Sequence, residues 1–475
     1  MTVVIIGAGP AGIAAARAAR DAGAAVVLLD AADGLGGQYW RHLPPDRPAR
    51  RQRRLHHGWS RFTALRDRLS ADAGCEIITG AQVWAIDRQD GRPRVHVLAG
   101  PPDGRARTPR TLLPDALVLA TGAHDRTLPF PGWDLPGVYS AGAAQALAKG
   151  ERVTVGGRVL VAGAGPFLLP VAAALTHTDA RVVGIHEAAR LPALVRNWTA
   201  RPWELFSALG KGGELGGYLL SQLRHRIPYV TGSAVVAAHG GERVESVTVA
   251  RLDSTWAPLP GTERRIEVDA VCVSHGFTPR LELAIAAGCR IGPDRFVVTD
   301  QDGRTSVEDV FAAGEITGIG GAQAAETEGA LAGLAAAGAA DERRTARLRR
   351  RRVSTTRFAA RIEGAHGIRP GWTAWLDGDT VLCRCEEVTH GELVDTVTAT
   401  RSRGLRSTKL TSRAGLGICQ ARMCGRNVEE ILGQTTPDGV IADASTDRRP
   451  IAAPISLAEL AALPAAPTAQ EGHTP

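Results

Sequence analysis

Short apolar runs that lead directly into glycine turns recur along this chain, and they predict strands buried in a parallel sheet. The first run covers residues 2–6 and opens into the turn Gly7-Ala8-Gly9-Pro10-Ala11-Gly12, after which alanine-rich sequence favours a helix. A second apolar run at 25–29 ends in Asp30. Strands buried on both faces show continuous apolar residues instead of alternation. The first thirty residues therefore predict a strand, a turn, a helix and a second strand.

The turn has the Gly-x-Gly-x-x-Gly spacing of a dinucleotide site. In that motif the first glycine permits a tight turn, the second lets the backbone approach a pyrophosphate, and the third lets the helix pack close to the strand. The pyrophosphate is expected at the free N–H groups where the helix begins, and an acid about 20 residues later meets a ribose hydroxyl. The predicted cofactor-binding residues of this unit are Gly7, Gly9, Pro10, Ala11, Gly12 and Asp30.

A second copy of the pattern begins with the apolar residues 159–162. Its turn contains Gly163 and Gly165, has Leu168 where the third glycine is expected, and is followed by a helix and an apolar run that ends in Glu187. The leucine loosens the packing of helix on strand but leaves the approach to a phosphate intact. We predict that this fold binds NAD(H) or another adenine nucleotide, with a vestigial, purely structural fold as the alternative. The carboxylate of Glu187 disfavours a 2′-phosphate, so NAD(H) is favoured over NADP(H).

Other segments extend the two units. Paired glycines in Gly36-Gly37-Gln38 would let a loop lie against a bulky cofactor, although a flexible turn has the same composition. The run at 115–120 predicts a buried strand that ends at Thr121-Gly122, and the run at 268–274 repeats it. Within that second run Cys272 is predicted to be a core residue. The remaining elements predicted in the first unit are a helix at 59–69 and strands near 76–86 and 93–98.

No catalytic residue can be assigned from these patterns. His275, directly after the run at 268–274, is predicted to be a satisfied turn residue and not a catalytic base. The chain shows no Ser–His–Asp set, no metal–water site and no paired-carboxylate pattern of a hydrolase. The chemistry is therefore expected to come from bound cofactors.

Four of the seven cysteines form two close pairs, Cys383 with Cys385 and Cys419 with Cys424. Each pair can be delivered by one loop, and four thiolates are what iron–sulfur clusters and structural zinc sites require. An odd total that is crowded in this way indicates reduced thiols and a metal site instead of a disulfide framework. The spacing alone leaves iron and zinc open.

The length and charge of the chain indicate how many domains it has and which partners are expected. A chain of 475 residues with 44% apolar content predicts roughly two to four domains. The net charge of +7 would suit an acidic partner, but no nucleic-acid-binding motif accompanies it. No leader precedes the first strand, and no apolar stretch approaches the roughly 18 residues of a membrane span. We expect a cytoplasmic protein without a nucleic acid partner or a transmembrane segment.

The two units together resemble a known superfamily. Two dinucleotide folds, the second inserted in the first, with Ala-Thr-Gly at 120–122 and Phe-Ala-Ala-Gly-Glu at 311–315, are similar to those of the FAD- and NAD-linked reductases of the glutathione and thioredoxin reductase superfamily. The resemblance implies that the first fold holds FAD. It also implies that Glu315, after Gly314, binds the ribityl chain of the flavin, at a position where Asp is commoner.

The same resemblance excludes one activity. The disulfide reductases of this superfamily need two cysteines close in sequence beside the flavin. Outside the C-terminal pairs this chain has only Cys75, Cys272 and Cys289, which are far apart in the sequence. A disulfide reductase is therefore not expected.

The sequence around the C-terminal cysteines resembles the bacterioferritin-associated-ferredoxin-like (BFD-like) 2Fe–2S domain, which favours a 2Fe–2S cluster over zinc. Nearly the whole chain resembles the FAD-binding subunit family of opine oxidases, hydrogen cyanide synthase and heteromeric proline or hydroxyproline dehydrogenases. Members of that family usually carry Gly after the Gln of the second cysteine loop, where this chain has Ala421. All four cysteine ligands are nevertheless present.

This second resemblance implies an electron-transfer subunit of a heteromeric amino-acid or opine (secondary amine) dehydrogenase, containing FAD and 2Fe–2S. A DAO-like, FAD-dependent catalytic subunit would oxidise the amine, and this chain would relay the electrons to an acceptor within a hetero-oligomer. A small 2Fe–2S ferredoxin-like subunit is a candidate third component. Two alternatives stay open: a self-sufficient NADH:acceptor reductase, with NADH at 163–187 reducing FAD and then the cluster, and a non-catalytic redox sensor or scaffold.

We therefore predict an α/β protein with two Rossmann-like FAD/NAD(P)-binding folds, the second inserted in the first, and a small helical C-terminal 2Fe–2S domain. The predicted boundaries are 1–125 and 280–340 for the FAD-binding domain, 126–279 for the second dinucleotide-binding domain, 341–375 for a basic helix and linker, 376–440 for the BFD-like 2Fe–2S domain, and 441–475 for a C-terminal arm and tail.

Overall fold

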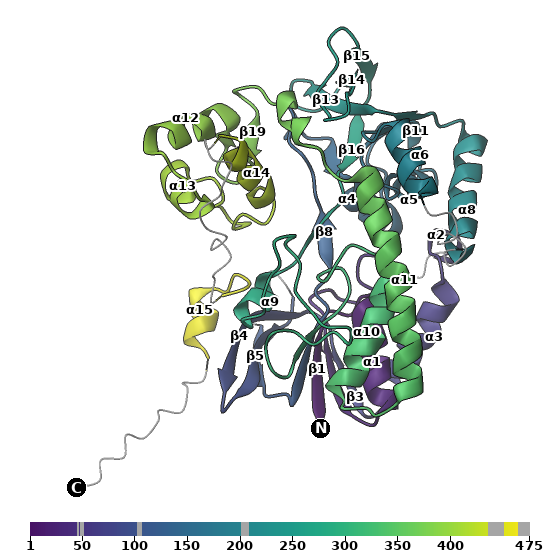
Figure 1. The fold of residues 1–475 in the computed structure, drawn as a ribbon, viewed down its shortest axis with the longest axis vertical. Helices are drawn as coiled ribbons and strands as arrows, with labels where there is room; N and C mark the ends of the chain where they lie inside the picture. The colour runs from purple at the N-terminus through teal and green to yellow at the C-terminus, as the bar shows by residue number, and fades with distance from the viewer. Residues whose placement is uncertain (45–46, 48–51, 102–106, 201–208, 436–450, 464–475) are drawn as a thin grey trace.

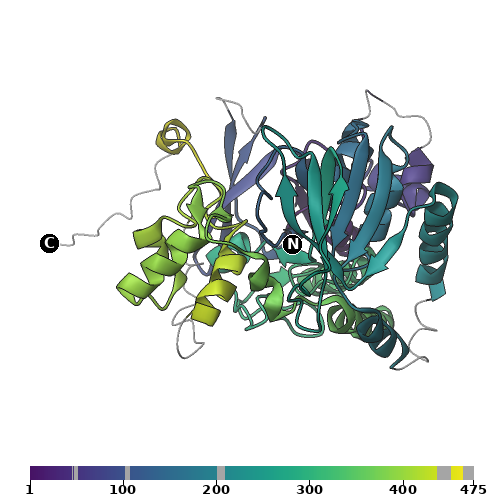
Figure 2. The ribbon, with the colours of Figure 1, turned by 90° about the horizontal axis from the view of Figure 1, so that it is seen from above.

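The computed structural model describes residues 1–44, 47, 52–101, 107–200, 209–435 and 451–463. Two five-stranded parallel sheets lie one above the other, and a small helical unit sits to one side of them (Figure 1). Seen from above, that unit and the teal helix α8 (Leu209–His225) lie on opposite sides of the molecule (Figure 2). None of the described helices is both long enough and apolar enough to cross a membrane.

The first sheet takes strands from two distant parts of the chain. β1, the first apolar run, pairs in parallel with β2 on one side and β7 on the other, and Val3 and Ile5 are fully buried. α1 (Pro10–Asp21) and α10 (Ala322–Ala336) pack against each other beside this sheet. The strand order is β18 (Val310–Ala312), β7 (Ala116–Leu119), β1 (Thr2–Ile6), β2 (Ala25–Leu29) and β3 (Cys75–Ile78).

The second sheet repeats this arrangement around the second glycine turn. β10 is its central strand, and α5 (Leu168–Leu175) follows the turn that β10 opens into. Cys272 is fully buried in this sheet, as predicted for a core residue. The strand order is β12 (Tyr229–Thr231), β11 (Arg181–Glu187), β10 (Arg158–Gly163), β16 (Ala270–Ser274) and β9 (Val138–Ser140).

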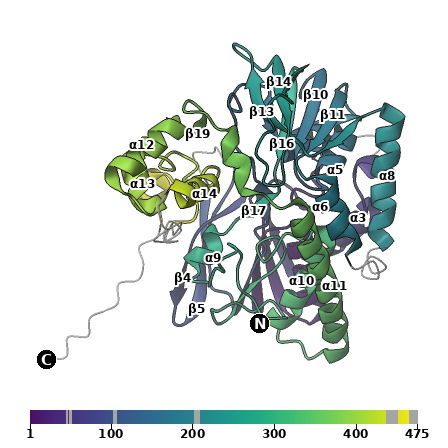
Figure 3. The same cartoon turned by 45° about the horizontal axis from the view of Figure 1, so that its top comes forward.

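The second sheet is inserted between β7 and β18 of the first. The chain crosses upward through β8 (Ala123–Asp125) and returns through β17 (Phe277–Pro279), and these two strands pair with each other in antiparallel fashion. Figure 3 shows β17 at the junction of the two sheets. The predicted fold class, with one dinucleotide fold inserted in the other, is therefore confirmed. The exact domain boundaries stay predictions.

Each sheet has a three-stranded antiparallel neighbour. The single strand expected near 76–86 is in fact two strands, because Gly80 (φ +59°) turns the chain between β3 and β4. The two antiparallel sheets consist of β4 (Ala81–Gln89), β5 (Arg92–Ala99) and β6 (Thr108–Leu112), and of β13 (Ser233–His239), β14 (Ser246–Arg251) and β15 (Arg264–Glu267).

Helices and turns outside the sheets complete the two folds. The helix expected at 59–69 is α3 (Trp59–Ser70). Other helices among the described residues are α2 (Gln52–Leu55), α4 (Ala141–Ala146), the π-helical turn η1 (Leu147–Glu151), α6 (Leu191–Thr199), α8 (Leu209–His225) and α9 (Glu282–Ala286).

The basic segment predicted as a helix and linker is docked along the molecule. α11 (Glu342–His366) packs on α10 and α6 and runs in Figure 1 along the first fold up to the lower part of the second. Some of its arginines pair with acids of the fold: Arg349 Nη2 lies 2.6 Å from Asp302 Oδ2, and Arg352 Nε lies 3.2 Å from Glu328 Oε1. This pairing explains why so basic a helix lies against the fold instead of forming a free linker.

The cysteine-bearing unit shares a core with the second fold. Trp375 donates from Nε1 to the carbonyl of Trp256 at 2.8 Å, and Leu382 and Leu393 pack in one buried cluster with Leu252. The unit is therefore held in place by apolar contact. It consists of η3 (Pro370–Trp375), β19 (Val381–Cys383), β20 (Val388–Thr389), α12 (His390–Thr400), α13 (Leu405–Ser412) and α14 (Gly425–Thr435).

The described part of the C-terminal arm returns to the first fold. Ala452 donates its N–H to the carbonyl of Trp84 at 2.7 Å. Further along, α15 (Leu457–Ala461) places Glu459 against Arg107, whose Nε lies 2.6 Å from Glu459 Oε1. The arm thereby packs on the β4–β5–β6 sheet.

The close approach of α1 and α10 depends on two glycines of α10. A Cβ on Gly329 would lie 2.0 Å from the carbonyl oxygen of Ala11, and one on Gly333 would lie 2.3 Å from that of Ala15. Backbone atoms of a helix cannot rotate away as a side chain can. These two positions therefore fix how closely α10 packs on the helix that begins at the first glycine turn.

We expect Gly329→Ala to lower the free energy of unfolding by about 1–3 kcal/mol, because the added methyl group forces the two helices apart. Urea unfolding followed by circular dichroism measures this change. Gly217→Ala in α8 is the matched control, since nothing lies within 4 Å of its added Cβ and alanine is the better helix former. Equal destabilisation by both substitutions would contradict the packing argument.

Candidate functional site

The first glycine turn has the geometry that a phosphate cradle needs. Gly7 has φ +102°, and a Cβ there would lie 2.2 Å from the carbonyl oxygen of Ala120. A Cβ on Gly12 would lie 1.7 Å from the carbonyl oxygen of Gly7. α1 begins at Pro10 with no side-chain cap, so its first N–H groups are free to meet an anion. The turn fits the pyrophosphate of a dinucleotide.

Asp30 closes this turn from the end of β2. Its Oδ2 accepts the N–H of Ala8 at 2.5 Å and its Oδ1 accepts that of Ala32 at 2.8 Å. Burial raises the pKa of this carboxyl above its usual range, and the two backbone N–H donors act against that rise. A carboxylate has about four acceptor positions, so Asp30 has capacity left for a ribose hydroxyl while it braces the turn.

The paired glycines after β2 form a packed loop and not a loose turn. Gly36 donates its N–H to the carbonyl of Ala8 at 2.8 Å. Gly37 has φ +55°, and a Cβ on it would lie 2.9 Å from the Cα of Gly9. The loop therefore lies directly on the first glycine turn and brings Gln38 to the same place.

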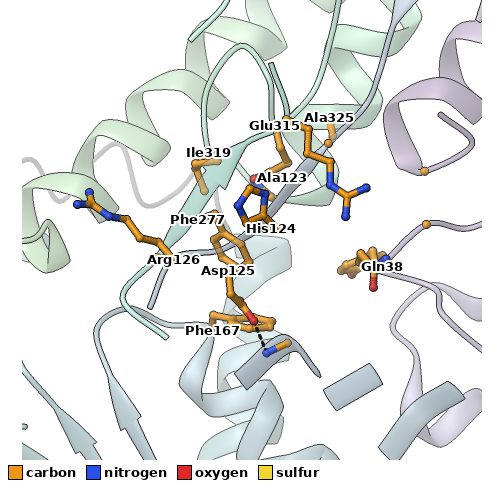
Figure 4. A pocket seen from close by; sticks show the side chains of 18 of the residues that line it. Gln38, Ala123, His124, Asp125, Arg126, Phe167, Phe277, Glu315, Ile319 and Ala325 are labelled. Atoms are coloured by element: carbon orange, nitrogen blue, oxygen red, sulfur yellow. Dashed lines mark hydrogen bonds between the residues drawn. The ribbon is translucent and has the colours of Figure 1, made fainter. Parts of the chain in front are cut away.

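One cavity of about 2330 Å³ runs between the two folds and collects most of the predicted site. In Figure 4, Gln38, Asp125 and Glu315 approach it from different sides. The predicted cofactor residues that line it are Gly7, Gly9, Pro10, Ala11, Asp30, Gly37, Gln38, Thr121, Gly122, Gly165 and Glu315. The predicted residues that do not line it are Gly12, Gly36, Gly163, Glu187 and Gly314.

Gly314 and Glu315 show how the Phe-Ala-Ala-Gly-Glu motif at 311–315 is placed relative to the cavity. Gly314 (φ +82°) would bring an added Cβ within 2.8 Å of the Cβ of Ala11, so it allows β18 to lie against α1. The neighbouring Glu315 reaches the cavity and accepts the N–H of Gly321 at 2.8 Å. The Phe-Ala-Ala-Gly-Glu motif thus delivers one carboxylate to the cavity beside the first turn.

The second glycine turn has the expected backbone but an unexpected acid. Gly163 (φ +139°) would place a Cβ 1.7 Å from the carbonyl oxygen of Ser274, and no heavy atom lies within 4 Å of a Cβ on Gly165. Glu187, however, is fully buried. Its carboxylate does not line the cavity, as a carboxylate available to bind a ribose hydroxyl would.

The chain's own donors occupy the Glu187 carboxylate. Its Oε2 accepts the N–H of Gly165 at 3.0 Å and the hydroxyl of Tyr229 at 3.2 Å. His366 Nδ1 lies 3.3 Å from the same oxygen without a hydrogen bond. Its Oε1 accepts the N–H of Ala189 at 3.0 Å. Burial, and then the Glu187 charge, raise the pKa of Tyr229 well above its usual range. A nucleotide in this fold would have to share Glu187 with these partners.

The crossover strands contribute site residues that no motif indicated. Asp125 accepts the N–H of Gly142 at 2.6 Å, and burial raises the pKa of its carboxyl. Phe167 and Phe277 lie edge to face, with ring centres 4.9 Å apart (Figure 4). His124 contacts the carbonyl oxygen of Arg422 at 3.1 Å. The sequence signal for these residues is only their place beside Ala-Thr-Gly and beside the second glycine turn.

The four predicted metal-binding cysteines come together in the C-terminal unit as two pairs. Cys383 and Cys424 are buried and interact with each other, whereas Cys385 is exposed and interacts with half-buried Cys419. No three His, Cys, Asp or Glu side chains of the described ranges surround a single point as ligands of one ion. A set of four thiols is the donor set of a 2Fe–2S cluster.

Neighbouring groups favour the thiolate form of Cys383, whereas the pKa values of Cys385 and Cys424 are raised. The Cys424 thiol and the N–H groups of Gly415, Glu386 and Cys385 lower the pKa of Cys383 to about 5, against the opposing effect of burial. Thiolate is the form that binds a metal. A Cβ on Gly417 would lie 2.2 Å from the Cβ of Cys385, so glycine is required where the second loop wraps the first.

The loop of the second pair has a strained backbone at the residue that departs from the family pattern. Gln420 (φ +53°) and Ala421 (φ +63°) both adopt the left-handed region. Glycine adopts this region freely, whereas for a residue with a Cβ it costs about 1–2 kcal/mol. This geometry gives a physical reason for the usual glycine after the glutamine.

The cavity connects the first glycine turn to the cysteine loop. Cys419, Arg422 and Met423 line it together with Gly9 and Glu315. Arg422 is itself fixed, because its Nε donates to Glu282 Oε1 at 2.6 Å. A cofactor on the first turn and a cluster on the four cysteines would therefore border the same space.

Comparisons with known proteins agree with this geometry. Residues 1–329 match the family model described as pyridine nucleotide-disulphide oxidoreductase, and residues 381–434 match that of the BFD-like 2Fe-2S binding domain. An opine oxidase subunit of Agrobacterium tumefaciens (strain Ach5) is 33% identical over 97% of this chain and 92% of its own length. Hydrogen cyanide synthase subunit HcnB of Pseudomonas aeruginosa is 32% identical over 89% of this chain and 90% of its own.

The fold likeness extends along nearly the whole chain. The crystal structure of L-proline dehydrogenase from P. horikoshii superposes with a TM-score of 0.66 at 20% identity, covering 97% of this chain and 79% of that one. The two family matches imply FAD and a 2Fe–2S cluster, so both of these predicted cofactors are confirmed. The role of each predicted site residue, and the ligand of the second fold, stay predictions.

We expect Cys419→Ser to remove most of the bound iron, because it replaces one of four thiolate ligands with a poor ligand for iron. Iron analysis and the visible spectrum of the anaerobically purified chain measure the loss. Cys75→Ala is the control: Cys75 is buried in the first sheet, away from the cysteine-bearing unit, and its removal should leave the iron content unchanged. Full iron content in Cys419→Ser would contradict the ligand assignment.

Proposed function

This chain belongs to the pyridine nucleotide-disulphide oxidoreductase family, and from that membership we propose that it is the electron-transfer subunit of a heteromeric amino-acid or opine (secondary amine) dehydrogenase. It is an FAD-dependent oxidoreductase with a 2Fe–2S domain. In the proposed complex, a DAO-like subunit with its own FAD oxidises the amine. This chain relays the electrons to an acceptor, and a small 2Fe–2S ferredoxin-like subunit is a candidate component of the complex.

The observation that carries this proposal is the cavity shared by the first glycine turn and Cys419. When bound, FAD supplies a centre that takes up two electrons together, and the cluster supplies one that passes single electrons. The protein fixes the geometry between the two: Arg422 is anchored on Glu282, and the carbonyl of Arg422 contacts His124 of β8. These contacts hold the cysteine loop against the crossover strands.

The cysteines outside the C-terminal unit do not support disulfide chemistry. Burial raises the pKa of Cys75 to about 11 and that of Cys272 to about 12. Cys289 is also buried, and its pKa is raised for the same reason. A reactive cysteine needs a lowered pKa and access. Membership of this family therefore does not bring disulfide reduction to this chain.

The relatives support a complex of several chains. Both are named as subunits, one of an opine oxidase and one of a hydrogen cyanide synthase. On this chain, the exposed Cys385 lies in a unit whose second cysteine loop carries Ile418, with 85% of its surface exposed. Leu410 of α13 is 70% exposed. Exposed apolar side chains beside a redox centre suit contact with another protein.

A self-sufficient NADH:acceptor reductase is the second candidate, because Gly165 of the second turn opens on the same cavity. The burial of Glu187 among its own partners weighs against it. In this alternative NADH, bound at 163–187, would reduce FAD directly. The relay proposal instead expects another subunit to be the source of electrons.

We expect the anaerobically purified chain to show flavin absorption bands, and a rhombic EPR signal after dithionite but not after NADH. Visible absorption and EPR spectra before and after each reductant test this. Prompt flavin bleaching and the same EPR signal with NADH would favour the self-sufficient reductase. A chain that cannot hold FAD even after reconstitution would favour the sensor or scaffold.

We also expect the purified chain alone to oxidise amino acids or opines at a negligible rate, because it lacks the proposed amine-oxidising subunit. Turnover with an artificial electron acceptor, tested across amino acids and opines, measures this. The control is the same assay with the chain copurified with its catalytic partner. Fast turnover by the single chain would overturn the division of labour.

A further inference from the structure

One wall of the cavity is explained by neither glycine turn. The volume of about 2330 Å³ exceeds the roughly 300–1,000 Å³ of most small-molecule pockets, so there is room for a ligand beside the flavin cofactor. This wall contains Arg41, which follows the Gly36-Gly37-Gln38 loop, together with Gln145 of α4 and Lys149 of η1. All three side chains end in N–H donors.

The backbone of η1 brings these donors together. The Arg41 side chain lies against Gly150, where an added Cβ would be 3.1 Å from Arg41 Cγ and 3.3 Å from its Nε. Arg41 also donates from Nη1 to Gln38 Oε1 at 3.2 Å. η1 is a π-helical turn that ends at Arg152 in the left-handed region (φ +59°), and such turns are frequent at functional sites.

Two of the three donors have no partner in the described part of the protein. Gln145 is only 7% exposed, and its Nε2 makes no hydrogen bond there. Lys149 has neither a hydrogen bond nor an ion pair with any described residue, and burial lowers its pKa to about 8. A buried donor or charge without an acceptor is unfavourable. An acceptor in the cavity would remove that penalty.

The charge on this wall is positive. Burial and then the charges of Lys149, His42 and Arg152 together lower the pKa of His56 to about 3. His56 is therefore neutral and adds no further positive charge. Arg152 donates to Gln52 Oε1 at 2.9 Å, which is a neutral acceptor. Among the described side chains, no carboxylate pairs with Arg41, Lys149 or Arg152.

We propose that Arg41, Gln145 and Lys149 form a binding site for a small oxyanion with two negative charges, either a phosphate monoester or a dicarboxylate. A guanidinium binds two oxygens of such a group side by side, the ammonium adds a point charge, and the amide N–H orients a third oxygen. The site does not depend on the relay proposal, since it would serve a substrate or an effector of either candidate function.

This site is separate from the phosphate positions expected at the two glycine turns. The FAD pyrophosphate is expected where α1 begins, at Gly9 and Pro10, and that of a second nucleotide where α5 begins, after Gly165. Lys149 comes from η1, which with α4 packs beside α5 and belongs to neither glycine turn. The oxyanion would therefore bind next to the cofactors and would not replace their phosphates.

Isothermal titration of inorganic phosphate and, separately, of succinate into the FAD- and cluster-loaded chain in a Tris-chloride buffer tests the site. We expect one of the two anions to bind one-to-one. Lys149→Met should weaken that binding roughly tenfold or more, because it removes a charged donor. Tighter phosphate binding identifies a phosphate monoester site, and tighter succinate binding identifies a dicarboxylate site.

Arg350→Met is the matched control, since it removes one exposed positive charge from α11, outside the cavity wall. It should leave anion binding unchanged. All three proteins should contain the same amount of FAD per chain, and the ligand-free Lys149→Met variant should melt no lower than the unmodified chain. Arg41→Gln, which changes an exposed side chain, provides a second variant should the first fold poorly.

Three results would overturn the proposal. The first is that neither anion binds to the loaded chain. The second is that Lys149→Met and Arg350→Met weaken binding equally, which would show only the general positive charge of the protein. The third is that Lys149→Met loses FAD together with the anion, which would show that these cations serve the phosphates of FAD itself.

Discussion

The chain crosses between its two parallel sheets twice, and the two crossings, β8 and β17, are hydrogen-bonded to each other. This pairing fixes the relative position of the two glycine turns, because each lies close to one end of the crossover. It also places Asp125 and His124 in the cavity wall. Because His124 contacts the carbonyl of Arg422, the same strand pair positions the cysteine loop. The shared cavity is thus a consequence of one short antiparallel ladder.

The sequence alone predicts those parts of the site whose geometry is set by contacts within one short segment. Gly7 and Gly12 belong to one short turn whose glycines are required by close backbone contacts, and the two cysteine pairs are each delivered by one loop. Such contacts require particular residue types at fixed spacings, and these spacings can be recognised in the sequence. The burial of Glu187 could not be predicted in this way, because its partners Tyr229 and His366 come from β12 and α11. The same holds for Asp125, whose place in the wall depends on the pairing of two distant strands.

Backbone strain in the second cysteine loop explains why glycine is expected at the position of Ala421. Ala421 stands where the resemblance described above leads one to expect glycine, and the structure places it in the left-handed region, as it does the neighbouring Gln420. Tight wrapping of this loop is also why Gly417 cannot carry a side chain beside Cys385. The cysteine loop therefore holds conformational strain where it wraps the loop of Cys385, as is common where a backbone encloses a functional centre.

The insertion of one fold in the other has a consequence for biosynthesis. All strands of the second sheet lie between residues 138 and 274, whereas the first sheet needs β18 at residues 310–312. Domains generally fold as units while the ribosome elongates the chain at about 5–20 residues per second. The fold that begins first must therefore wait for the one inside it. During translation the edge of β7 that β18 will cover therefore stays unpaired for many seconds.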